Sequence, residues 1–481
     1  MSVLLAGVTL LLELLSLVDV ATGSMRAHEA TRTGAGVLAV PAASATVYTV
    51  GAGGAYAHLQ DAIDAAVAHP GDDEVRVHTG VYTEGFVVPT TMTAAALDIS
   101  GGWADGFAAK APGGTLNTLL VPPPGTRGAW LQPLGGTLTV RELHFFDAST
   151  TTPGAGLLVQ PQNGAAVLIV GNLIEGSVVT SSSYAAGAAI AVDAQGSGEV
   201  DLLDNSIFDS HALIAVGGTG TVYGAAVDVS CGGSTHCVVA GNDIRQTEAA
   251  ARGGVVWGGA VRLFLRSAVQ AQFDRNRIAA VTVGPDAIQT RGRSLYVDAA
   301  GQAAVLSGSN RFLAGWPVGG SGALDEVRWN LGDQANLVFS DSLVAQSPLT
   351  GVKVVLGGSA SADLTNLTVV DNAAGVLVVS GSSQSAHLSN SLVSNAFAAG
   401  DFQGTVFSHN GFGLSLPFLA PALYDYSLRR FEPAVHDAGD DAPDGGLGLG
   451  DIDSRNRVLG PHVDLGAWET SDRLYADRVD R

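Results

Sequence analysis

The sequence predicts an all-β protein that folds as a parallel β-helix, a solenoid in which short strands stack coil upon coil. Three observations carry this prediction. Short apolar runs are separated by turn residues, and glycine supplies 63 of the 481 residues. Two strand-like segments recur at a nearly constant separation. The repeating unit shrinks to 24 residues, which is too short for a propeller blade of about 40 residues.

The first recurring segment is a strand in which an outward residue stands between two apolar neighbours. In eight units the central residues are Leu158, Ala191, Asp228, Arg262, Tyr296, Arg328, Lys353 and Leu377. Equivalent positions of successive coils lie about 4.8 Å apart. We therefore predict that these eight residues form one line on one sheet, which we call the outward column.

The second recurring segment carries a polar residue near a turn, with an apolar residue two places later in every unit but the one that has Thr368. The polar residues are Asn172, Asn205, Asn242, Asn276, Asn310, Asp341, Asn366 and Asn390. Each follows its column residue by 14 positions in the first five units and by 13 in the last three. Asparagine tolerates tight turns and bonds to its neighbour one coil away, so we assign this line a structural role. Further coils predicted at 137–145 and 404–412 bring the total to nine or ten.

The two ends of a solenoid expose its core and need covering. The segment 55–69 predicts an amphipathic helix, because Leu59, Ile63 and Val67 recur every four residues and Pro70-Gly71 ends the run. We predict four regions: a leader or export segment at 1–46, an N-terminal cap at 47–98, the β-helix at 99–425, and an acidic C-terminal cap or anchor at 426–481.

The two cysteines stand in "SCGGSTHC", and the short loop between Cys231 and Cys237 favours a local disulfide if the chain is exported. A reduced or metal-linked pair is the alternative, although two cysteines and one histidine lack a fourth zinc ligand. The N-terminal stretch is apolar but contains Glu13 and Asp19 and no basic start, so the expectation of export depends on the rest of the chain.

The segment 48–88, "YTVGAGGAYAHLQDAIDAAVAHPGDDEVRVHTGVYTEGFVV", resembles the entry segment of pectin-lyase-like right-handed β-helix proteins. The segment 426–469, with "DAG", "DID" and "DLGAWE", resembles the C-terminal, anchor-type motif of bacterial extracellular β-helix proteins. The resemblance implies a right-handed, single-stranded helix, an extracellular or cell-surface location and carbohydrate ligands. The catalytic patterns of polygalacturonases, pectate lyases and pectin methylesterases are missing, so it implies no mechanism.

The formal net charge of −21 argues against nucleic acid or an anionic membrane surface as the main partner. We expect a monomer whose partner is a polysaccharide or a cell-surface glycan. Membrane association through the C-terminal segment stays open.

Five residues of the outward column are polar or charged: Asp228, Arg262, Tyr296, Arg328 and Lys353. Arginine can hold a carboxylate in bidentate fashion, and a tyrosine or lysine beside it can abstract a proton next to a uronate carboxyl. These five residues are therefore candidates for catalysis by β-elimination, with a solvated structural face as the alternative. For glycan binding without catalysis the candidates are Trp257, Arg262, Arg266, Arg275 and Arg277. Trp103, Trp130 and Trp316 are further aromatic residues that a sugar could stack on. Trp329 could do the same, but it flanks Arg328 on the inward side, so we expect it to be in the core.

The C-terminal segment offers oxygen ligands of the type that calcium prefers. The candidates are Asp437, Asp440, Asp441, Asp444, Asp451 and Asp453. Their spacing matches neither an EF-hand loop nor a nonapeptide repeat, and a solvated, turn-rich cap is the alternative. The sequence as a whole predicts an extracellular protein that binds or is displayed toward polysaccharide. A lyase or hydrolase acting on acidic glycans and a structural or adhesive surface protein are the two alternatives.

Overall fold

The computed structural model describes residues 45–313, 325–394 and 405–469, apart from Thr93, Asn163, Ser382, Pro417, Tyr424, 429–431 and Leu449. The described residues all fall in one compact unit. The predicted leader lies outside them except for its last two residues, and Trp316 also lies outside. No helix among the described residues is long and apolar enough to cross a membrane.

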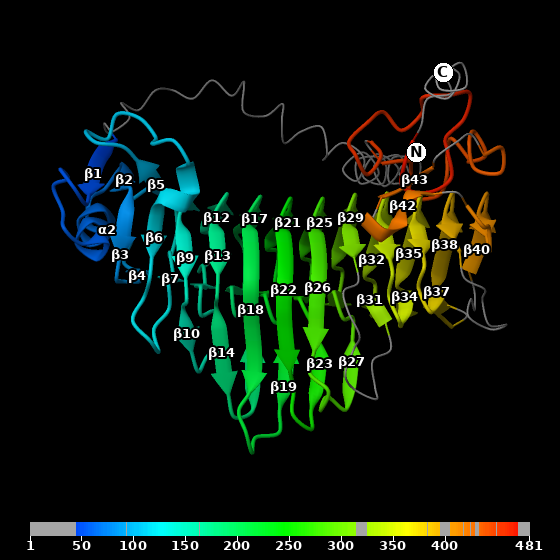
Figure 1. Ribbon diagram of the computed structural model, residues 1–481, viewed down its shortest axis with the longest axis horizontal. Coiled ribbons are helices and arrows are strands. Elements are labelled where there is room, and N and C mark those ends of the chain that lie inside the picture. Colours follow the sequence, from blue (N-terminus) through cyan, green and yellow to red (C-terminus); the bar gives the residue numbers. More distant parts are fainter. Residues whose placement is uncertain are drawn as a thin grey trace, which may run out of the picture. The chain divides into compact units, whose positions relative to one another are not determined.

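The described chain forms a parallel β-helix whose strands stack in three long sheets and one short one (Figure 1). Sheet 1 has 13 strands: β1 (Thr46–Val50), β2 (Asp72–His78), β5 (Ala96–Trp103), β8 (Thr137–Arg141), β12 (Ala166–Val170), β17 (Glu199–Leu203), β21 (His236–Ala240), β25 (Gln270–Asp274), β29 (Ala304–Gly308), β32 (Asn336–Ser340), β35 (Ser361–Thr365), β38 (Ser385–Ser389) and β40 (Thr405–Ser408). Sheet 2 has 14: β3 (Gly80–Tyr82), β6 (Thr118–Leu120), β9 (His144–Phe146), β10 (Ser149–Thr150), β13 (Leu173–Glu175), β14 (Val178–Ser181), β18 (Ser206–Ile214), β22 (Asp243–Ala250), β26 (Arg277–Val283), β30 (Arg311–Leu313), β33 (Leu343–Ala345), β36 (Thr368–Val370), β39 (Leu392–Val393) and β41 (Gly411–Phe412).

Sheet 3 has ten strands and carries the outward column: β4 (Phe86–Val88), β7 (Ala129–Leu131), β11 (Leu157–Val159), β16 (Ile190–Ala194), β20 (Val227–Cys231), β24 (Val261–Leu265), β28 (Leu295–Ala299), β31 (Asp325–Leu331), β34 (Thr350–Leu356) and β37 (Ala374–Val379). Sheet 4 extends the middle coils with β15 (Tyr184–Ala186), β19 (Thr221–Tyr223), β23 (Val255–Trp257) and β27 (Gln289–Arg291). The ten strands of sheet 3 match the predicted number of coils. Sheet 1 has three more strands, because β1 and β2 of the predicted N-terminal cap and β40 of the late coil predicted at 404–412 also pair into it.

The core is one continuous apolar cluster that runs from Tyr48 to Val393. It forms because every strand alternates inward and outward residues, as in β24, where Val261 and Leu263 are buried and Arg262 between them is half-buried. Stacking the coils lines up the inward residues, so that Phe273, Phe312 and Phe339 follow one another with ring centroids 6.3 and 6.4 Å apart. A single coil could not bury these side chains alone.

The helix predicted at 55–69 is present but begins later, as α2 (Leu59–Ala68), because Tyr56 instead forms a β-bridge with Val50 of the first strand. Its buried residues include Leu59, Ile63 and Val67, which join the same apolar cluster as the first strands and so close the core at this end. Its first turn has no capping side chain of its own. Instead the Glu84 carboxylate accepts a hydrogen bond from the Leu59 backbone N–H at 3.0 Å, which satisfies a donor that the helix leaves unpaired.

The asparagine line forms a buried hydrogen-bonded ladder. The side-chain oxygens of Asn205, Asn242, Asn276 and Asn310 each accept the backbone N–H and the side-chain amide of the asparagine one coil earlier, at 2.9–3.2 Å. The ladder continues through Ser342, whose hydroxyl accepts the Asn310 N–H at 3.1 Å.

The predicted alignment is therefore wrong by one residue in the last three units. The register pairs Arg311 with Leu343, Thr368 and then Leu392, so Ser342, Leu367 and Ser391 take the ladder position. Asp341, Asn366 and Asn390 precede it and adopt left-handed backbone with φ of 50°, 56° and 49°. Asparagine and aspartate tolerate that conformation. They therefore occur one position before the ladder, where the sequence pattern mistakes them for ladder residues. The spacing from column to ladder is 14 residues throughout, and Val369, not Thr368, stands at the inward position.

The described C-terminal part contains one antiparallel pair, β42 (Phe418–Ala420) and β43 (Asp425–Leu428), with the 3₁₀ turn η2 (Pro421–Leu423) between them. Another 3₁₀ turn, η1 (Gly114–Asn117), lies near the other end. The segment 433–469 packs along the flank of sheet 2. Just ahead of it, Tyr426 of β43 donates to Asp371 at 2.8 Å. Within the segment, Arg457 reaches Asp341, and the Ala467 N–H donates to the Thr368 hydroxyl at 2.9 Å. This segment therefore covers the side of several coils.

Candidate functional site

The outward column lies in one register along sheet 3. Leu158 pairs with Ala191, Asp228, Arg262, Tyr296, Arg328, Lys353 and Leu377 in succession. Val87 and Trp130 extend the line by two strands at the N-terminal end. Backbone hydrogen bonds between neighbouring strands hold this spacing, so the column is a rigid surface.

The first half of the column forms the floor of a groove of about 460 Å³. Its floor residues are Trp130, Leu158, Ala191, Asp228 and Arg262, with Gln160, Asp193 and Ser230 beside them on the same strands; Arg127, Thr152, Pro153 and Tyr184 lie at its sides. The groove combines an apolar middle with aromatic rings and planar polar groups. Small-molecule and sugar sites have this composition, because apolar contact supplies affinity and a few polar groups fix orientation.

Trp130 is the tryptophan that lines the groove, whereas sequence analysis favoured Trp257. The indole N–H of Trp130 donates to Gln160 at 2.9 Å, and the Arg127 guanidinium lies 5.6 Å from the ring centroid. These contacts hold the half-buried ring in place. Trp329 is fully buried in the core, and Trp103 is buried beneath Arg76 and Lys110.

Sheet 4 borders the column through a tight turn that recurs four residues before it. Gly224 and Gly258 occupy this turn with φ of 44° and 73°, and a Cβ on either would lie 2.1 Å from a backbone carbonyl oxygen. Glycine is required there because no other residue fits. The turn places the sheet 4 aromatics Tyr184, Tyr223 and Trp257 in a row beside the column. Their ring centroids follow one another, and then meet Tyr296 of the column itself, at 5.3–5.5 Å.

Asp228 and Arg262 form a charged pair at the β20–β24 end of the groove. Arg262 donates from Nε to Asp228 Oδ1 at 2.6 Å and from Nη2 to Oδ2 at 3.0 Å, a bidentate contact between adjacent coils. The Arg262 guanidinium also lies 4.0 Å from the Tyr223 ring centroid. Burial raises the pKa of Asp228, and Arg262 opposes that shift. Among the described residues the Nη1 group of Arg262 has no hydrogen-bond partner, so it is the donor that an added ligand could use.

The second half of the column lies outside this groove. Tyr296 is buried, accepts a hydrogen bond from the Asn330 amide at 2.7 Å, and has a pKa raised by burial. Arg328 donates to Asn330 at 2.9 Å and to Asp325 at 3.1 Å. Burial lowers the pKa of Lys353, and Arg328 beside it lowers it further. The five charged or polar column residues therefore share one line but do not converge on one point.

The other arginines predicted for glycan binding do not join Arg262. Arg266 lies past the aligned part of β24, where it contacts Asp298 at 3.1 Å and stacks on Phe264 at 3.7 Å. Arg275 and Arg277 lie at the turn between sheets 1 and 2, beside Asp274 and Asp243. These arginines are close to Arg262 in the sequence but not in one site, because residues 10–15 positions apart in a coil lie on different sheets.

The six C-terminal aspartates do not gather into one set. Each carboxylate has its own contact: Asp437 with the His462 N–H, Asp440 with the Ala442 N–H, Asp441 with His462, Asp444 with His387, Asp451 with the Asp453 and Arg455 N–H groups, and Asp453 with Arg311. These contacts close turns and fasten the segment to the solenoid. The expected calcium ligands thus have structural partners instead of a common centre.

The structure joins Cys231 and Cys237 in a disulfide. The bond links the end of β20 in sheet 3 to β21 in sheet 1, and both sulfur-bearing residues are buried. It therefore closes the turn between two sheets within one coil. Directly before Cys237 stands His236, whose side chain points to the outer face of sheet 1.

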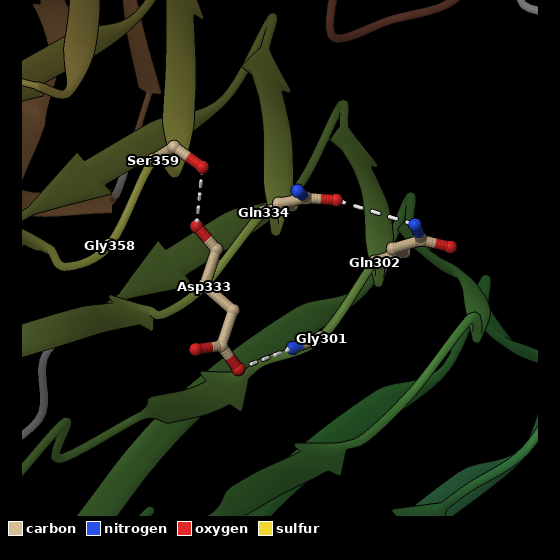
Figure 2. Close-up of a pocket in the computed structure, with 6 residues that line it drawn as sticks. All are labelled: Gly301, Gln302, Asp333, Gln334, Gly358 and Ser359. Carbon is tan, nitrogen blue, oxygen red and sulfur yellow. Dashed lines mark hydrogen bonds between the residues drawn. The ribbon is translucent and has the colours of Figure 1, made fainter.

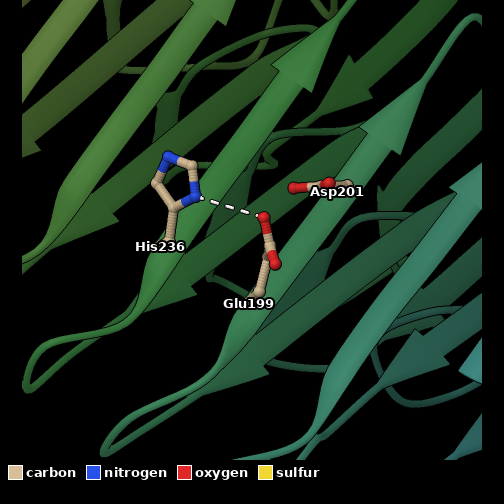
Figure 3. A group of neighbouring side chains, drawn as sticks. All are labelled: Glu199, Asp201 and His236. Atoms are coloured by element: carbon tan, nitrogen blue, oxygen red, sulfur yellow. Dashed lines mark hydrogen bonds and ion pairs between the residues drawn. The ribbon is translucent and has the colours of Figure 1, made fainter. Parts of the chain in front are cut away.

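His236 lies beside Glu199 and Asp201 of the preceding coil (Figure 3). In the described part of the chain, this is the one group of three or more histidine, cysteine, aspartate or glutamate side chains close enough to share a metal ion. His236 Nδ1 lies 3.3 Å from Glu199 Oε1, and this contact raises the pKa of His236. The sequence alone did not reveal the group, although the 37 residues from Glu199 to His236 equal the spacing from Asn205 to Asn242 in the same coils.

A second hollow, of about 500 Å³, lies over the stacked turns that join sheets 3 and 1 (Figure 2). Gln302 donates to Gln334 at 3.3 Å, and the Asp333 carboxylate accepts the Gly301 N–H at 3.0 Å. Ser359 donates to the Asp333 carbonyl at 3.1 Å. The polar groups that line this hollow pair with one another across coils. Such pairs hold the stacked turns of a solenoid together.

Comparisons with models of protein families, with curated proteins and with solved structures find no match.

Proposed function

We propose that this chain is an extracellular or cell-surface protein, allied to the pectin-lyase-like right-handed β-helix proteins of bacteria, that binds a polysaccharide in the groove over β7–β24. One observation carries the proposal: the groove sets the Tyr184 ring beside a floor that includes the Trp130 ring and the Arg262–Asp228 pair. Sugar rings offer C–H faces to aromatic side chains and hydroxyls to planar polar groups. An aromatic ring also supplies a large contact area with little loss of conformational freedom.

The shape of the groove favours a chain over a compact ligand. The floor follows one line across β7, β11, β16, β20 and β24, and strands of a sheet are spaced about 4.8 Å apart. Five strands therefore span roughly 19 Å, the length of several sugar rings. The disulfide between Cys231 and Cys237 suits an oxidising location outside the cell.

The side-chain contacts favour binding over catalysis. Tyr296 is a poor base because it is buried with a raised pKa, and Lys353, whose pKa is lowered, stands four strands from Asp228 and outside the groove. A lyase or hydrolase acting on acidic glycans therefore becomes an outcome to be tested, as does a structural or adhesive role without a glycan.

Affinity electrophoresis on a panel of neutral and acidic polysaccharides tests the proposal. The wild type should be retarded by at least one polymer, and Trp130→Ala should weaken the binding at least about fivefold, the effect expected for losing an aromatic anchor worth about 1 kcal/mol or more. Tyr184→Ala should act in the same direction. Phe412→Ala is the matched control, since Phe412 and Tyr184 are each 38% exposed and Phe412 lies on sheet 2.

Three results would count against the proposal. Retardation that survives both groove substitutions would move the binding site elsewhere. The absence of retardation by any polymer would favour a structural role. A rise in absorbance from unsaturated uronate products would establish a lyase in place of a binding protein.

A further inference from the structure

Glu199, Asp201 and His236 converge on the outer face of sheet 1. Glu199 and Asp201 stand two residues apart on β17 and so point to the same face, and His236 on β21 is the register partner of Glu199. One ligand atom from each lies within 4.8 Å of the others (Figure 3). All three side chains are half-buried, although they stand on an outer face.

The backbone under these side chains is held on every side. β17 pairs with β12 and β21, and β21 pairs with β17 and β25, each in continuous parallel register. The His236 N–H donates to the Gly198 carbonyl at 2.9 Å, and the next residue, Cys237, is fixed by the disulfide. Only side-chain rotations are left to adjust. A site on such strands is better preorganised than one on a loop.

We propose that Glu199, Asp201 and His236 bind a divalent transition-metal ion, with Zn²⁺ as the best fit. One imidazole nitrogen and two carboxylate oxygens form three corners of a tetrahedron, and the fourth corner faces outward for water or an external ligand. The imidazole disfavours Ca²⁺ and Mg²⁺, which prefer all-oxygen sites.

The distances suit this ion. Zinc bonds to nitrogen and oxygen at about 2.0–2.2 Å, so neighbouring ligand atoms of a tetrahedral site lie roughly 3.4 Å apart. His236 Nδ1 and Glu199 Oε1 are 3.3 Å apart, which is such an edge. The remaining separations stay within 4.8 Å and need side-chain shifts of about 1 Å. The strands themselves do not have to move.

A second histidine that contacts two carboxylates shows that these residue types do not by themselves converge on one point. His211 on β18 contacts Glu248 through Nδ1 at 2.9 Å and Asp209 through Nε2 at 3.0 Å. Its carboxylates lie on opposite sides of the ring, so they cannot meet at one ion. The His211 group therefore has the same residue types as the His236 group but a different geometry. This makes His211 the matched control.

The bound ion would cross-link two adjacent coils on the sheet that continues from the disulfide turn. An ion that binds the folded chain and not the unfolded one raises stability by mass action. The groove lies on sheet 3, so the metal site and the proposed glycan site are independent and can fail separately.

Calorimetric titration of the disulfide-intact chain, without a polyhistidine tag, with ZnCl₂ is the test. We expect one site per chain, a thermal midpoint that rises with added Zn²⁺, and no response to CaCl₂. His236→Gln and Asp201→Asn should each weaken the binding at least about tenfold. His211→Gln should leave it unchanged.

Added Co²⁺ reports on the ligands directly, since its visible absorption intensifies on tetrahedral binding. That band should be present in the wild type and in His211→Gln, and missing in His236→Gln. Circular dichroism shows whether each variant is folded. The proposal is overturned if the wild type takes up no Zn²⁺, or if His236→Gln and Asp201→Asn, both folded, bind it as the wild type does.

Discussion

Two outer faces of the solenoid use their charged residues in different ways. On sheet 3 the Asp228–Arg262 pair joins neighbouring coils and lines an open groove. On the flank of sheet 2 the charges hold a distant segment in place: Arg457 contacts Asp341 at 3.4 Å and donates to the Gly466 carbonyl. Both partners there are almost fully buried. On the open face the Arg262 guanidinium thus keeps one donor group for a ligand. On the covered flank the charged groups pair with other parts of the same chain.

The largest expected effect is therefore on the covered flank. Arg457→Met should lower the free energy of unfolding by about 3–5 kcal/mol, because Asp341 would stay buried without its counter-charge. Denaturant unfolding measures the change. Arg455→Met is the control, since Arg455 is 53% exposed and should contribute less than about 0.5 kcal/mol. Similar losses in the two variants would show that the C-terminal segment is not held through this pair.

The next effect is a pH dependence that belongs to the same flank. Glu469 is fully buried beside Asp464 and Arg457, and burial raises its pKa from 4.5 to about 7. Burial likewise raises the pKa of Asp341 from 3.8 to about 6. Between the unfolded and folded pKa values the folded state binds protons that the unfolded state has lost. Stability from these groups therefore falls as the pH rises from 3.8, where Asp341 begins to contribute, to about 7, the raised pKa of Glu469, and is level above that range.

Glu469→Gln isolates this contribution, because glutamine resembles the protonated acid and does not titrate. Between pH 5 and pH 8 the wild type should lose on the order of 1–3 kcal/mol more unfolding free energy than the variant. Denaturant unfolding at both pH values checks the difference. Parallel pH profiles for the two proteins would mean that the Glu469 carboxyl titrates normally.

The same contrast separates what the sequence could predict from what it could not. Register along sheet 3 was predictable because the apolar pattern of each strand has a fixed period and the column residue always stands between two inward residues. The ladder was misaligned at Asp341, Asn366 and Asn390, where two neighbouring positions both accept asparagine or aspartate for different backbone reasons.

The groove and the covered flank were not predictable from strand patterns. The side of the groove at Thr152 and Pro153 comes from a turn whose path depends on tertiary contacts. The Asp341–Arg457 pair joins residues that no repeat relates. The group at His236 was accessible in principle, since Glu199 and His236 are one repeat apart, but only after the coils had been aligned.

The smallest expected effect tests whether the open face extends beyond the groove. Lys353 is half-buried at the far end of the charged part of the column, and within the described parts of the chain its amino group makes no hydrogen bond or ion pair. Lys353→Met should therefore change the unfolding free energy by no more than about 0.5 kcal/mol. If a bound polyanion followed the column past Arg262, the same substitution would weaken its binding severalfold at low salt and less at high salt, because salt screens an exposed charge. Affinity electrophoresis at two ionic strengths measures this. Unchanged binding would confine the ligand to the strands from β7 to β24, where the aromatic rings and the Arg262–Asp228 pair lie.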